Sequence, residues 1–168
     1  KKDIALGGSA STVIEEIKEL EDLKSLSLIN AGFFDDDLVE LLSFEGLKTV
    51  EVMDFTGNSI SLEQPSREAL MSFSNLRELY LSENEIPEDN AELLLQKITE
   101  KLTKIETVDL SENNIDEETA KELEKRYENS GLEVLLDDQR ESIDPDDYEQ
   151  AEEEHEEAER KRIGRELY

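Results

Sequence analysis

Apolar residues recur in a fixed order four times between residues 20 and 115. In each copy they occupy five positions, and successive copies start 27, 26 and 29 residues apart. Two of the five positions, such as Leu79 and Leu81, are separated by one residue, which is the period of a strand with one buried side. We therefore expect four short strands that pair in parallel and bury the same side. The five columns are Leu20/Leu47/Phe73/Leu102, Leu23/Val50/Leu76/Ile105, Leu26/Met53/Leu79/Val108, Leu28/Phe55/Leu81/Leu110 and Phe33/Ile60/Ile86/Ile115.

A polar column follows each strand, with Asn58, Asn84 and Asn113 in three copies and Ala31 in the first. An asparagine at the end of a strand can pair with backbone groups where the chain turns, which a leucine cannot do. We assign these asparagines to structure rather than to binding. Because Ala31 lacks the amide, we expect the first copy to be locally irregular.

The stretches between the strands have the spacing of amphipathic helices. Pro65 and Pro87 mark two helix starts, because proline is well tolerated in the first turn. Thr12 with Glu15 is predicted to form the capping box of a helix near the start of the chain, and Asp116 to cap the last one. A final strand is expected at 132–136. The predicted inward-facing residues are Val13, Ile17 and Leu20; Leu38, Leu41 and Leu42; Ala69, Leu70 and Phe73; Ala91, Leu94, Leu95 and Ile98; and Ala120, Leu123 and Tyr127.

These positions together match the leucine-rich repeat consensus L-x-x-L-x-L-x-x-N-x-L, and the helix-length spacing resembles repeats of the ribonuclease-inhibitor type. The resemblance implies an α/β solenoid over residues 1–136, with about four full repeats and partial terminal ones, parallel strands on the concave face and helices on the convex face. Residues 4–6 resemble the end of a repeat strand and no polar cap precedes them. We therefore expect further repeats upstream of Lys1 in the natural protein.

The charge of the chain changes which partners it can bind. Its 46 acidic and 18 basic residues give a net charge of −28 over 168 residues, which disfavours nucleic acids and anionic membrane surfaces. The excess continues in residues 137–168, where 14 acids face five bases. We expect this segment to be a separate acidic tail, helical from about residue 146, in which Ile163 and Leu167 could contact an apolar patch. The sequence shows no membrane-length apolar run and no signal peptide.

The residue types needed for most catalytic and metal sites are scarce in this chain. It has no cysteine, and its single histidine, His155, lies within the acidic tail. The acidic run 35–37 lacks the glycine and the distant glutamate of a calcium loop, so we interpret it as helix capping. We therefore expect no enzymatic activity, no metal site and no cofactor.

A protein partner remains the best-supported ligand, and the residues between the buried strand positions could bind it. The predicted partner-binding residues on the concave face surround one exposed tyrosine with carboxylates, an arrangement suited to a basic protein surface. The alternative is that these positions are polar only because they face solvent. The predicted set is Glu51, Asp54, Arg77, Glu78, Tyr80, Glu106 and Asp109.

The end of the repeat region also resembles one family. The sequence LSENNIDEETAKELEKRYENSGLEVLLDD at 110–138, followed at once by an acidic run, is similar to the C-terminal end of Ran GTPase-activating proteins. The resemblance implies a crescent that binds a Ran-like small GTPase and activates its GTP hydrolysis without an arginine finger. It also implies a location in the cytoplasm, or shared between nucleus and cytoplasm. The family's functional asparagine lies in earlier repeats and matches no position of this chain.

Two other functions fit the same features. Leucine-rich repeats joined to an acidic tail also occur in acidic chaperones of histones and other basic proteins, although a spacing of 26–29 residues is longer than is typical there. The chain could instead be a scaffold subunit of a larger assembly.

Overall fold

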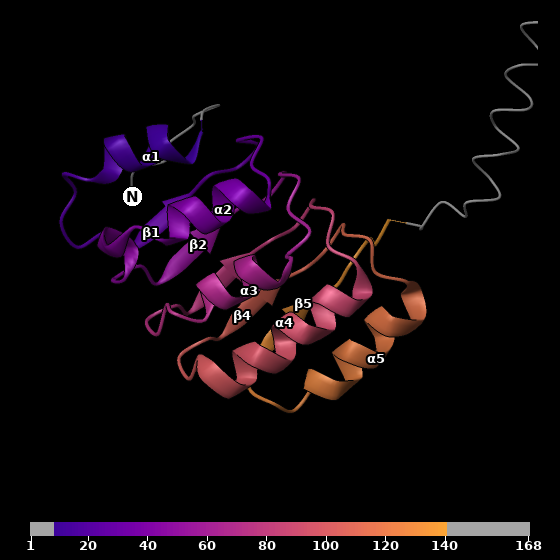
Figure 1. Ribbon diagram of the computed structural model, residues 1–168. Coiled ribbons are helices and arrows are strands. Elements are labelled where there is room, and N and C mark those ends of the chain that lie inside the picture. Colours follow the sequence, from indigo (N-terminus) through magenta and orange to yellow (C-terminus); the bar gives the residue numbers. More distant parts are fainter. Residues whose placement is uncertain (1–8, 141–168) are drawn as a thin grey trace, which may run out of the picture.

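A computed structural model of the chain describes residues 9–140, and within them the fold is α/β. Five strands form one parallel sheet in the order β1-β2-β3-β4-β5. An α-helix precedes each strand along the chain, and a 3-10 helix also lies between α2 and β2. Figure 1 shows the helices in front of the strands, following one another from indigo to orange. The elements are α1 (Ala10–Ile17), β1 (Ser25–Ser27), α2 (Asp35–Leu42), the 3-10 helix η1 (Glu45–Leu47), β2 (Val52–Asp54), α3 (Gln64–Leu70), β3 (Glu78–Tyr80), α4 (Glu88–Lys101), β4 (Thr107–Asp109), α5 (Glu117–Tyr127) and β5 (Glu133–Leu135).

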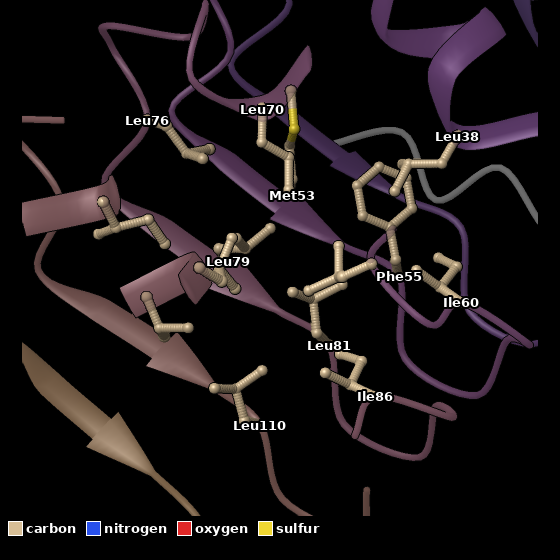
Figure 2. Packing of buried hydrophobic residues seen from close by; sticks show 14 of the residues in the cluster. Leu38, Met53, Phe55, Ile60, Leu70, Leu76, Leu79, Leu81, Ile86 and Leu110 are labelled. Atoms are coloured by element: carbon tan, nitrogen blue, oxygen red, sulfur yellow. The ribbon is translucent and has the colours of Figure 1, made fainter. Parts of the chain in front are cut away.

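The register of the sheet brings the third apolar column of the sequence into one line. Leu26 pairs with Met53, Met53 with Leu79, and Leu79 with Val108. All four side chains are completely buried, and Figure 2 shows Met53 and Leu79 packed among residues of the neighbouring elements. The four predicted strands are confirmed, and the fifth, expected at 132–136, is confirmed as β5.

Most of the predicted helix positions are confirmed as well. The buried residues of α2, α4 and α5 are those that the apolar spacing predicted. Proline lies in the first turn of α3, and the Asp116 side chain accepts a hydrogen bond from the backbone N–H of Thr119 at the start of α5. Only Ala69 of α3 and Leu20 after α1 are half-buried rather than buried.

The predicted capping box of the first helix is wrong. Helix α1 begins at Ala10, its N-cap residue is Ser9, and Thr12 already lies in the first helical turn. The backbone N–H of Thr12 donates to the Ser9 carbonyl, so the threonine cannot cap the same helix. The helix begins earlier because Ala10 is completely buried together with Val13 and extends the apolar stripe by one turn.

A ladder of buried amides joins the segments that follow the strands. The amide nitrogen of Asn84 donates to the carbonyls of Phe55, Leu81 and Ser82 at 2.9–3.1 Å, and its oxygen accepts the backbone N–H of Ile60. Asn113 makes the equivalent set of bonds one strand further on. Both side chains are completely buried, so the predicted structural role of the asparagine column is confirmed.

The first and last positions of this ladder depart from asparagine. Beside Ala31 the backbone takes an extra left-handed residue at Gly32, with φ of 73°, which confirms the expected irregularity. At the other end Gln139 donates to the carbonyls of Leu110 and Leu136 and accepts from Asn113. The backbone hydrogen bonds thus reach Arg140, four residues beyond the boundary predicted at 136.

Two polar side chains connect neighbouring helices in ways that the sequence did not indicate. Asp35, at the start of α2, accepts hydrogen bonds from Ser61, Glu63 and Ser66 of the next segment. Arg67 of α3 is only 7% exposed. Its guanidinium donates hydrogen bonds to the Leu62 carbonyl and to the side-chain oxygen of Asn90 in α4. Of the acidic run 35–37, Asp37 caps α2 as expected, through the backbone N–H of Phe34.

Some sequence predictions concern residues that the structure does not describe. The strand end expected at 4–6, the helical tail from about residue 146 with Ile163 and Leu167, and His155 all lie outside residues 9–140. Within the described range, none of the helices is long and apolar enough to cross a membrane.

Candidate functional site

The sheet has one buried side and one side that the helices leave uncovered. In β1 to β4 the central residue is buried and the two residues beside it are half-buried. We call this uncovered surface the strand face, and it also includes the residue that precedes each strand. The strand face consists of Lys24, Ser25, Ser27, Glu51, Val52, Asp54, Arg77, Glu78, Tyr80, Glu106, Thr107 and Asp109.

The pairing register places three predicted binding residues side by side. Asp54 of β2 is the partner of Tyr80 in β3, and Tyr80 is the partner of Asp109 in β4. Since neighbouring strands lie about 4.8 Å apart, the two aspartates flank the tyrosine across roughly 10 Å. Each aspartate is oriented by its own backbone, because Oδ1 of Asp54 accepts from the Thr56 N–H and Oδ1 of Asp109 from the Ser111 N–H.

Tyr80 is the centre of this arrangement. Its hydroxyl donates to Oε2 of Glu78 at 2.7 Å. This hydrogen bond, together with desolvation and the negative charges of Glu78, Asp109 and Asp54, raises the pKa of Tyr80 to about 12. The phenol therefore remains neutral at physiological pH and presents an aromatic ring with a carboxylate on three sides.

The remaining predicted binding residues are engaged in ion pairs. Lys24 contacts Glu51 at 3.2 Å, and Arg77 contacts Glu106 at 2.5 Å. The hydrogen bond from Arg77 to Glu106, together with the negative charge of Glu106, also raises the pKa of the arginine above its ordinary value. The cations of the strand face thus pair with two of its outer acids, whereas Asp54, Glu78 and Asp109 take part in none of the ion pairs found within residues 9–140.

The raised pKa of Tyr80 can be tested directly. We expect the ultraviolet difference titration between the native chain and Tyr80→Phe to show one tyrosine ionising near pH 12. Because the folded-state pKa lies above the ordinary value of 10, this tyrosine stabilises the fold fully below pH 10 and loses that contribution as the pH rises through 12. Replacing the acceptor by Glu78→Gln should move the transition back toward 10. An unchanged midpoint in that variant would contradict the carboxylate as the cause.

One acidic residue of β5, next to the strand face, was not predicted. Glu133 of β5 is exposed, pairs in register with Thr107, and its Oε2 accepts a hydrogen bond from the threonine hydroxyl at 3.2 Å. The signal was present in the sequence, since Glu133 lies one residue before Val134 in the last expected strand. It extends the negative surface to the final strand.

Other hollows of the described region are less suited to a specific ligand. A depression of about 590 Å³ lies between the start of α5 and residues 136–140 and is lined by acidic residues on both sides, with Lys121 and Arg140. A second one of about 500 Å³ lies between α4 and α5 beside the ion pair of Arg126 with Glu92. Among residues 9–140, no three histidine or acidic side chains gather as metal ligands.

No protein-family model matches the chain, and no curated protein matches it.

Proposed function

We propose that this chain is a leucine-rich repeat solenoid whose strand face binds a basic segment of a protein partner. Three features support the solenoid: four aligned sequence copies, a parallel sheet whose strands follow chain order, and the asparagine ladder that repeats from strand to strand. Each unit covers the apolar side of the next, which leaves a continuous strand face as the natural interaction surface.

The row Asp54–Tyr80–Asp109 is the observation that carries the proposed binding. Its carboxylates have no cationic partner among the ion pairs of residues 9–140, whereas Glu51 and Glu106 do. Lysine or arginine side chains of a partner would meet these charges beside a half-exposed aromatic ring, a combination that gives both steering and contact area. Two cations about three residues apart in an extended segment would match the roughly 10 Å between the two aspartates.

Charge reversal on the strand face tests this binding. We expect Asp54→Lys, Glu78→Lys and Asp109→Lys together to weaken the binding of a fluorescent oligolysine peptide roughly 10- to 100-fold at low salt, because attraction becomes repulsion. The control variant is Glu118→Lys, Glu122→Lys and Glu128→Lys, which makes the same charge change at exposed positions on and after α5. Fluorescence anisotropy measures both dissociation constants. Equal weakening in the two variants would show that total charge decides binding and that the strand face does not.

A Ran-like small GTPase is the specific partner that the sequence at 110–138 favours, through its similarity to Ran GTPase-activating proteins. The test compares two protein probes, a GTP-loaded Ran-like GTPase and core histones, on the native chain and on the strand-face variant. Binding of the GTPase that the variant loses would support an activator of that kind. Histone binding that the variant retains and that collapses with salt would support an acidic chaperone instead.

A further inference from the structure

The chain carries its own basic segment. Four of the five basic residues after position 136 lie between 160 and 165: Arg160, Lys161, Arg162 and Arg165. The residues between this segment and the described part of the chain, 141–159, contain 11 acids and no base. The sequence therefore separates a strongly acidic spacer from a compact basic segment.

The acidic spacer and the basic segment would interact with the strand face in opposite ways. The acidic spacer is repelled by the charges of Asp54, Glu78 and Asp109, whereas the basic segment is attracted by them. Lys24 and Arg77 form their ion pairs with Glu51 and Glu106 rather than with these three acids. Of the segments after residue 140, the one at 160–165 has the charge that the strand face needs.

The length of the spacer allows the contact. Arg140 follows the end of β5 by five residues, and its backbone N–H donates to the carbonyl of Asn113, which follows β4. The 20 residues from Arg140 to Arg160 can span up to about 66 Å when fully extended, and about 40 Å when the helix expected from residue 146 is formed. Crossing the five strands requires only about 19 Å. The basic segment can therefore reach Asp54 and Tyr80 in the middle of the sheet.

We infer that residues 160–165 occupy the strand face of the same molecule. There they block the binding of a partner's basic segment until the partner displaces them. This inference rests on the proposed function for its consequence, because the segment would then compete for the partner's site. Its physical basis is the unpartnered face of the sheet, charge complementarity and the reach of the chain. A partner must outcompete a tethered cationic segment, which makes the affinity of the full chain weaker than that of the strand face alone.

A cysteine-pair experiment tests the contact without reference to any partner. The native chain has no cysteine, so a pair introduced by Ser27→Cys and Ile163→Cys reports only on that contact. The control pair combines Ile163→Cys with Gln96→Cys, an exposed position of α4. We expect an intramolecular disulfide to form at least about tenfold faster in the Ser27 pair at low salt, and this advantage to vanish at high salt. Equal rates for the two pairs, or a disulfide-linked dimer whose formation rises with protein concentration, would overturn the inference.

A competition experiment tests the consequence. Neutralising the segment by Arg160→Gln, Lys161→Gln, Arg162→Gln and Arg165→Gln should strengthen oligolysine binding roughly tenfold. The matched control is Lys97→Gln, Lys101→Gln, Lys104→Gln and Lys125→Gln, which changes the net charge equally at residues that form none of the ion pairs of the described region. Equal effects of the two sets would contradict the inference.

The two experiments separate the inference from the proposed function. If the Ser27 pair shows no advantage while oligolysine binding still depends on the strand face, the inference fails and the proposed function stands. If the Ser27 pair crosslinks rapidly but oligolysine binding is insensitive to strand-face reversal, the proposed function fails and the intramolecular contact stands.

Discussion

Asn84→Asp is expected to lower the free energy of unfolding by about 4 kcal/mol. The side chain is completely buried, and its amide nitrogen satisfies three backbone carbonyls at once, those of Phe55, Leu81 and Ser82. Aspartate has nearly the same shape and can still accept from Ile60, but it offers at most one proton and only when neutral. The variant therefore leaves buried carbonyls unpaired or places a carboxylate against them, and both are costly.

Urea unfolding followed by circular dichroism measures this loss, with Asn114→Asp as the matched control. Asn114 is the next residue after the ladder position Asn113, and it is half-exposed. The same chemical change there should alter stability by less than about 0.5 kcal/mol. A small loss in both variants would mean that the asparagine ladder does not hold the strands together.

Phe55→Ala is expected to lower the free energy of unfolding by a similar amount, about 3–5 kcal/mol. Phe55 is completely buried and lies directly after β2, where Figure 2 shows its ring close to Leu38 and Ile60. Removing the ring takes away packing contacts from segments on both sides of the strand and leaves a cavity that the surrounding backbone cannot close.

Phe34→Ala provides the control, because Phe34 is 61% exposed at the start of α2. The same truncation there should cost less than about 0.5–1 kcal/mol. The measurement is again the free energy of unfolding from denaturant titration. Comparable losses at the two positions would contradict the core as the structure shows it.

The fold could largely be predicted from the sequence because the pattern of apolar positions repeats. Four copies with the same apolar columns predicted the strands and placed Leu26, Met53, Leu79 and Val108 on one buried side, as found. The helix start before α1 was predicted wrongly because a capping-box pattern at Thr12 is a local signal, whereas burial of Ala10 is decided by packing against the rest of the core.

From the sequence, the candidate site could be predicted only as a set of positions, without the contacts between them. The sequence predicted seven residues on one surface, but it did not show that Glu51 and Glu106 would form ion pairs with Lys24 and Arg77. It also missed Glu133, and it did not reveal that Tyr80 would donate to Glu78. These partners come from other strands or depend on side-chain orientation, so spacing along one strand cannot identify them.

The sequence by itself determined the alternation of buried and exposed positions, the places where helices and strands occur, and the excess of negative charge. These properties depend on local geometry and composition, which do not require knowledge of distant contacts. The tertiary structure decided which charges meet, how Asp35 and Arg67 tie successive helices together, and that Gln139 ends the ladder in place of asparagine. The physical reason is that hydrogen bonds and ion pairs act over a few ångströms, and only folding brings residues 23 to 29 positions apart within that distance.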